Sequence, residues 1–154
     1  MGLVTIRIRA ASFDDAEVQK LVSDALGDLS QRYGGSGDDT PVAAEEFVPP
    51  RGAFFVALDG HDLIGCAGWR AHGEDAELER MYTASAARGR GVARRLLAAI
   101  EESARANGHK RVILETGDRQ PEAIALYESA GYRRIEDFGF YKDHEGVLSY
   151  ARAL

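Results

Sequence analysis

Residues 82–97 read Y-T-A-S-A-A-R-G-R-G-V-A-R-R-L-L, which combines a strand end, a short loop, an Arg/Gly-rich turn and the start of an amphipathic helix. A turn of this kind leaves backbone N–H groups unpaired at a helix N-terminus, where the helix dipole adds partial positive charge. Gly89 and Gly91 have no Cβ, so a bulky anion can approach the backbone closely. The stretch therefore predicts a phosphate or pyrophosphate site, although glycines at a helix start also serve as ordinary caps.

The length and composition of the chain indicate a single folded domain over residues 1–154, with 45% hydrophobic and 29% charged residues. The net charge of −6 argues against general nucleic-acid binding, which favours a basic face. No run approaches the roughly 20 apolar residues that span a bilayer, and the first residues lack the pattern of a signal peptide. Cys66 is the single cysteine, which excludes an internal disulfide. We therefore expect a cytoplasmic protein that binds neither nucleic acid nor membrane.

Alternating apolar residues predict strands, and apolar residues at helical spacing predict helices. The expected order is a strand over 4–8, a helix capped by Ser12, a short helix that starts at Thr40 or Pro41 and ends before Pro49, strands over 53–58, 63–70 and 76–83, a helix from the Arg/Gly turn to Gly108, a strand over 112–114, a helix from Pro121 to Gly131, and strands over 132–135 and 147–151. Residues 34–39, G-G-S-G-D-D, are expected to form a flexible loop within the domain. The order predicts an α/β (α+β) fold with a mixed sheet covered by helices.

A second motif follows in residues 114–132, which read L-E-T-G-D-R-Q-P-E-A-I-A-L-Y-E-S-A-G-Y. The two motifs together resemble the cofactor site of the GNAT superfamily of N-acetyltransferases. The first matches the order Gln or Arg, then Gly, then Gly or Ala, in Arg88-x-x-Gly91-x-Ala93. The second matches Asn-x-x-Ala-x-x-Leu-Tyr-x-x-x-Gly-Phe, with Gln120 in the place of Asn, at Ala123, Leu126, Tyr127, Gly131 and Tyr132. The resemblance extends over nearly the whole chain, and it implies a mostly antiparallel sheet of about seven strands flanked by four helices.

The resemblance also implies acetyl-CoA as the cosubstrate. Its pyrophosphate would lie on the turn formed by Arg88, Gly89, Arg90, Gly91, Val92 and Ala93. The backbone of Met81, Tyr82 and Thr83 would hydrogen-bond the pantetheine arm. Gln120 would contact the same arm, although it could also be a loop residue without a special role. We expect no metal, because the four histidines show no metal-ligand spacing.

The chemistry of amine acetylation needs a proton acceptor and a donor to the departing sulfur. Glu77 and Glu79 lie two residues apart on one face of the predicted strand. Counted back from Arg88, Glu77 falls at the frequent general-base position of the family, and Glu79 is the alternative; either could instead be solvated or pair with an arginine. Tyr127 matches the tyrosine that donates to the thiolate in many relatives, although it could also be a core residue.

The resemblance further implies direct transfer within a ternary complex, with the acceptor against the first two helices, the loop at 34–40 and the last hairpin. A small amine or amino acid is the expected acceptor. Asp38, Asp39, Glu45 and Glu46 favour a cationic one, unless they are merely solvated. Two alternatives stay open, namely a protein N-terminus or lysine as acceptor, and a non-catalytic acyl-CoA-binding sensor. A homodimer is one assembly that we consider.

Overall fold

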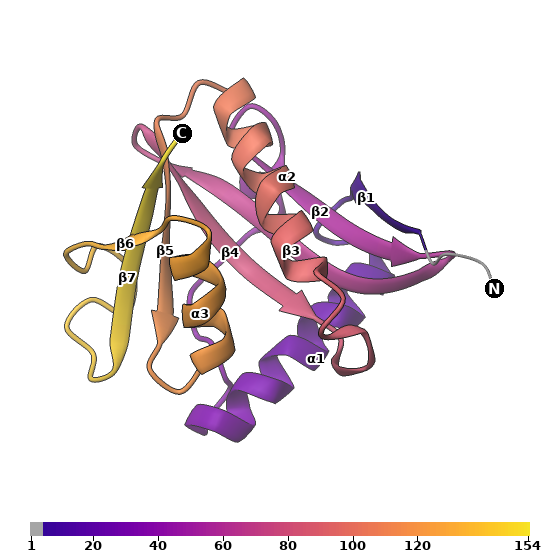
Figure 1. The fold of residues 1–154 in the computed structure, drawn as a ribbon, viewed down its shortest axis with the longest axis horizontal. Helices are drawn as coiled ribbons and strands as arrows, with labels where there is room; N and C mark the ends of the chain where they lie inside the picture. Colours follow the sequence, from indigo (N-terminus) through magenta and orange to yellow (C-terminus); the bar gives the residue numbers. More distant parts are fainter. Residues whose placement is uncertain (1–4) are drawn as a thin grey trace.

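The computed structural model describes residues 5–154 and contains a seven-stranded sheet in the order β1-β2-β3-β4-β5-β7-β6 (Figure 1). The strands are β1 (Ile6–Ala10), β2 (Gly52–Asp59), β3 (Asp62–His72), β4 (Asp75–Thr83), β5 (Arg111–Gly117), β6 (Arg133–Arg134) and β7 (Val147–Ala153). Neighbouring strands are antiparallel except β4 and β5, which are parallel. The mixed, mostly antiparallel sheet is therefore the predicted one; Val4, predicted in the first strand, lies outside the described residues.

Three α-helices accompany the sheet within residues 5–154: α1 (Ala16–Tyr33), α2 (Val92–Ala106) and α3 (Pro121–Ser129). The fourth helix predicted from the sequence is wrong, because that segment forms only the 3-10 turn Ala44–Phe47. Two arginines account for the difference. Arg80 donates to the carbonyl of Thr40 (2.9 Å), and Arg70 donates to the carbonyl of Pro41 (2.7 Å). These carbonyls therefore accept hydrogen bonds from side chains of the sheet instead of from the first turn of a helix.

The first helix begins later than predicted. Its N-cap is Asp15, whose carboxylate accepts a hydrogen bond from the backbone N–H of Glu17 at 3.0 Å. Ser12 instead uses its backbone carbonyl to close a preceding turn with the N–H of Asp15. Asp and Ser are comparable N-caps, so the two positions could not be distinguished by residue type alone.

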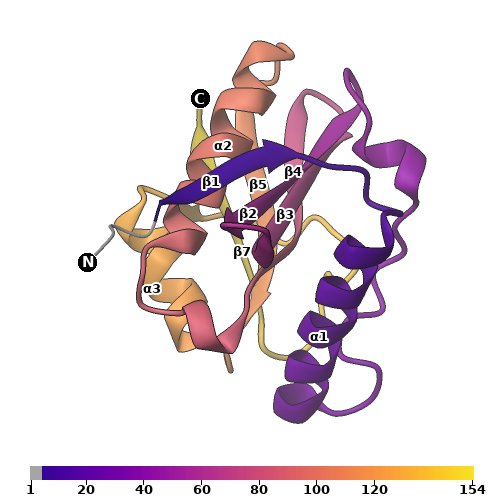
Figure 2. The ribbon, with the colours of Figure 1, turned by 90° about the vertical axis from the view of Figure 1, so that its right-hand side faces the viewer.

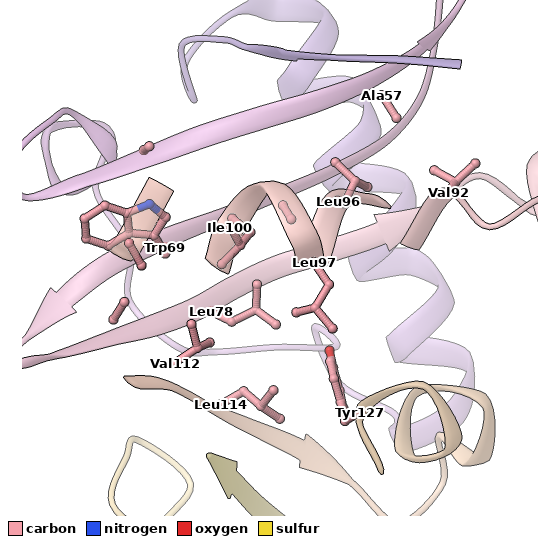
Figure 3. Packing of buried hydrophobic residues seen from close by; sticks show 14 of the residues in the cluster. Ala57, Trp69, Leu78, Val92, Leu96, Leu97, Ile100, Val112, Leu114 and Tyr127 are labelled. Atoms are coloured by element: carbon pink, nitrogen blue, oxygen red, sulfur yellow. The ribbon is translucent and has the colours of Figure 1, made fainter. Parts of the chain in front are cut away.

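The helices lie on two faces of the sheet, with α1 on one face and α2 and α3 on the other (Figure 2). The apolar side of α2 explains its position, because Leu96, Leu97 and Ile100 are fully buried against the sheet. Figure 3 shows this layer, which includes Ala57, Trp69, Leu78, Val92, Val112, Leu114 and Tyr127. The face toward α1 carries a second apolar cluster around Val18, Phe54 and Val56.

The parallel strands β4 and β5 stay paired over a short distance only. Their register joins Asp75–Glu77 to Arg111–Ile113, and beyond these residues the strands run apart (Figure 1). The register of β4 with β3 is irregular between Cys66 and Gly68, opposite Arg80, whose φ of 55° is unusual for a residue with a side chain. This bend leaves one edge of the second half of β4 without a partner strand in the described chain.

Candidate functional site

The Arg/Gly turn forms an open cradle of backbone N–H groups at the start of α2. Gly89 and Gly91 have φ angles of 80° and 77°, and a Cβ at either position would meet no atom within 4 Å. The first hydrogen bond of the helix runs from Arg95 N–H to the carbonyl of Gly91 at 3.1 Å. Within the described residues, the N–H groups of 89–94 have no acceptor, so they are free to bind a ligand.

Arginine side chains hold this turn against its neighbours. Arg88 donates to the carbonyl of Thr83 at 3.2 Å, and Arg90 contacts the carboxylate of Asp59 at 3.2 Å. At the end of β4, the buried hydroxyl oxygen of Thr83 has no hydrogen-bond partner among residues 5–154. A buried hydroxyl without a partner costs free energy.

A cavity of about 100 Å³ lies where β4 and β5 separate. Its walls come from both strands, α1, the loop at 34–40 and α3, and include Leu78, Glu79, Arg80, Met81, Leu114, Glu115, Thr116, Gln120, Tyr127 and Tyr141. Gln120 occupies the N-cap position of α3, but its side chain makes no hydrogen bond to the helix; its amide lies 3.4 Å from the hydroxyl of Tyr33. Gln120 lines the cavity, and its predicted contact with the cosubstrate stays a prediction.

Tyr127 projects from α3 into the region between the strands. Figure 3 shows its hydroxyl end pointing toward Leu97, and the hydroxyl lies 3.8 Å from the sulfur of Met81, which is a weak acceptor. Burial, and to a smaller extent the charge of Glu79, raise the pKa of Tyr127 above its ordinary value. The phenol is therefore protonated at neutral pH and free to donate a hydrogen bond to a better acceptor.

The two predicted carboxylates lie on the same face of β4 but in different surroundings. Both contact the guanidinium of Arg70, at 3.2 Å for Glu77 and 3.5 Å for Glu79. Glu79 lines the cavity that contains Tyr127, whereas Glu77 lines a separate hollow of about 460 Å³ beside Glu46 and His72. Only Glu79 is therefore brought together with Tyr127.

The electrostatic setting of Glu79 opposes its ionisation. Burial is the main cause that raises its pKa well above the ordinary value, followed by the hydrogen bond and the charge of Glu77. Arg80 and Arg70 act in the opposite direction. A carboxyl with a raised pKa in a cleft is a stronger base than an ordinary glutamate when it does ionise.

The cavity also contains residues that the sequence did not single out for the site, among them Arg80, Glu115 and Tyr141, whereas Asp38 had been expected to favour a cationic acceptor. The segment 34–39 was predicted to be flexible, yet its contacts hold it in place. Asp38 pairs with Arg80 at 2.7 Å and accepts a hydrogen bond from the hydroxyl of Tyr141 at 3.0 Å. Tyr141 lies about a hundred residues away in sequence and carries no local motif that could have identified it.

Residues 5–154 contain no group of three or more His, Cys, Asp or Glu side chains arranged to hold a metal ion. No helix in this part of the chain combines the length and apolar character that crossing a membrane requires.

Comparison with known proteins places these features in context. The model of the acetyltransferase (GNAT) family matches residues 20–132. An IAA acetyltransferase from Azospirillum brasilense is 34% identical over 145 residues, which cover 92% of each chain. An acetyltransferase of the GNAT family from Staphylococcus aureus Mu50 has a TM-score of 0.78 at 18% identity, covering 97% of this chain and 99% of its own. A GNAT family acetyltransferase from Elizabethkingia anophelis, solved with acetyl-CoA bound, has a TM-score of 0.71 at 18% identity, covering 97% and 98%. These similarities confirm the predicted fold.

The raised pKa of Glu79 predicts a pH-dependent effect of Glu79→Gln on stability. Folding favours the protonated carboxyl of Glu79. Its contribution to the free energy of unfolding is therefore complete below the pKa of an unfolded glutamate, about 4.3, and is lost as the pH rises through the pKa of Glu79 in the folded state. The free energy of unfolding of the variant, relative to wild type, should therefore increase from about pH 4 to pH 8. Urea denaturation measures it, with the exposed Glu102→Gln as control. A relative stability that falls with pH would contradict the raised pKa.

Proposed function

Since the chain belongs to the GNAT family of acetyltransferases, we propose that residues 1–154 form one catalytic domain that transfers an acetyl group from acetyl-CoA directly to the primary amine of a small molecule or amino acid. Acetyl-CoA supplies the acetyl group as an activated thioester. One observation carries the proposal: Glu79 and Tyr127 line the same cavity, at the point where β4 and β5 separate. A proton acceptor and a proton donor are thus available together.

The proposed binding site for acetyl-CoA uses groups that the fold leaves unpaired. The free N–H groups of 89–93 would bind the pyrophosphate, with Arg88 and Arg90 adding positive charge. The unpaired edge of β4 at 81–83 would hydrogen-bond the pantetheine arm, beside the unpartnered hydroxyl of Thr83. Gln120 would contact the same arm from the opposite side of the opening.

In the proposed mechanism, the ammonium group of the substrate loses a proton to Glu79, and the free electron pair of the amine then attacks the carbonyl carbon of the thioester. The C–S bond breaks as the amide forms, and the nitrogen gives up its second proton to the departing thiolate. Tyr127 donates a hydrogen bond to the sulfur that departs. Glu77 has a supporting role, because it shares Arg70 with Glu79 and its negative charge raises the pKa of its neighbour. The spacing to Arg88 favoured Glu77 as the base. The proposal assigns that role to Glu79 instead, because Glu77 lines another hollow.

Replacement of Gly91 by valine should weaken acetyl-CoA binding at least about tenfold, because a β-branched residue disfavours the φ of 77° and distorts the N–H cradle. Calorimetric titration with CoA measures the loss. The control is Gly108→Val at the other end of α2, where φ is 85° and the surroundings are equally open. Similar affinity in both variants would remove the turn from the binding site.

Replacement of Tyr127 by phenylalanine should lower turnover by about one to three orders of magnitude, because one proton donor is lost while the ring remains. CoA affinity should stay nearly unchanged. The matched control is Tyr132→Phe, whose ring centroid lies 5.8 Å away and whose hydroxyl donates to Glu101 at 2.8 Å. That variant should lose stability but keep turnover. If Tyr127→Phe loses stability and CoA affinity together with turnover, Tyr127 is a packing residue.

Exchange of the two carboxylates for glutamine should separate their roles. Glu79→Gln should lose turnover at neutral pH and regain part of it as the pH approaches the pKa of the amine, because unprotonated substrate then becomes abundant. Glu77→Gln should retain turnover and shift the acidic limb of the pH–rate profile to lower pH, because a charge that raises the pKa of Glu79 is removed. The opposite pair of results would make Glu77 the base.

A further inference from the structure

A second cavity adjoins the candidate active site on the side of α1. It has a volume of about 240 Å³ and lies between α1, the loop at 34–40, the end of β5 and the segment that leads into β7. The two cavities share Leu29, Asp38, Glu115, Thr116, Gln120 and Tyr141 as lining residues. A molecule in the second cavity would therefore reach the opening that Glu79 and Tyr127 line.

Tyr141 bridges two distant loops at this shared wall. Its hydroxyl donates to the carboxylate of Asp38 at 3.0 Å and accepts from the N–H of Asp39 at 2.6 Å. Its own N–H donates to the carboxylate of Glu115 at 3.1 Å. The bridge therefore joins the loop at 34–40 to the segment between β6 and β7.

The loop under the bridge is anchored from its other side. Asp38 pairs with the buried guanidinium of Arg80 at 2.7 Å. Gly37 packs so closely on α1 that a Cβ there would clash with the carbonyl of Leu26, and its φ of 93° also favours glycine. The two loops that flank the cavity are thus fixed against the sheet and against α1.

From this geometry we propose that the acceptor is a compact amine that carries a second positive charge, enclosed beneath the bridge of Tyr141 and Asp38. The inference rests on the proposed function and specifies its substrate class. A peptide acceptor needs an open groove that leads its chain away from the reacting terminus, and the hydrogen bonds of Tyr141 with Asp38 and Asp39 join the two loops that flank the cavity. The volume of the cavity is just below the range of about 300–1,000 Å³ that is usual for drug-sized ligands.

The charge of the lining supports a cationic acceptor. Asp38, Glu115 and Glu145 line the second cavity with His144, and no lysine or arginine is among its described lining residues. The charge of Asp38 is offset by Arg80, whereas Glu115 has no cation within ion-pair distance in the described chain. Glu115 is also half-buried, and burial raises its pKa. A positively charged group beside it would compensate for this loss of hydration.

The size limit is tested by CoA release with three acceptors: butylamine, diaminobutane, and a short peptide with a free N-terminus and no lysine. The wild type should use the peptide least well. Tyr141→Ala should raise kcat/KM for the peptide relative to diaminobutane at least about tenfold, because the bridge is lost. The control is Lys142→Ala, an exposed neighbour outside the cavity lining. A wild type that prefers the peptide, or an unchanged ratio in Tyr141→Ala, would overturn the inference.

The charge requirement is tested with the two amines of equal length. Diaminobutane should have a lower KM than butylamine in the wild type, and Glu115→Gln should raise only the KM for diaminobutane, by about tenfold. Glu136→Gln, an exposed carboxylate in the same connection as Tyr141, is the control. Equal KM changes for both amines would overturn the inference and leave the proposed function standing. If the wild type binds acetyl-CoA but none of the amines causes it to release CoA, the proposed function fails, and the inference fails with it.

Discussion

The separation of β4 from β5 is the constraint on which the candidate site depends. A parallel pair that continued beyond Glu77 and Ile113 would close the opening with backbone hydrogen bonds and leave no room for a substrate. The bend at Arg80 prevents this, because its positive φ and the irregular register with β3 turn the strand away. The fold therefore gives up several strand hydrogen bonds at its centre, and the packing of α2 and α3 on one face keeps the sheet together.

Two guanidiniums organise the other face of the opening. Arg70 and Arg80 hold four carboxylates, those of Asp38, Glu46, Glu77 and Glu79, together with carbonyls of the preceding loop. Burial of Glu79 is the main cause that raises its pKa, and the charge of Glu77 adds to it, because negative charges outnumber positive ones in this partly buried cluster. The same network thus anchors the loop over the second cavity and sets the basicity of the residue proposed to receive the proton.

The parts of the structure that could be predicted from the sequence are those that carry local chemistry. Gly91, Gly108 and Pro121 mark helix ends through backbone conformations that few other residues favour, so α2 and α3 were expected close to their observed bounds. Arg80 could not be identified in this way, since nothing in its neighbours requires a positive φ. Tyr141 and its partner loop could not be found either, because their contact joins residues about a hundred positions apart and depends on the completed sheet.

The sheet separates two electrostatic environments that suit two different substrates. The face toward α2 offers free backbone N–H groups and arginines at the Arg/Gly turn, which attract an anion such as a pyrophosphate. The face toward α1 carries the carboxylate cluster, which attracts a cation and repels an anion. On the proposed function, an anionic donor and a cationic acceptor would each be favoured on one face and disfavoured on the other. Only the uncharged acetyl thioester and the reacting amine would then meet in the opening between the strands, where Tyr127 and Glu79 lie.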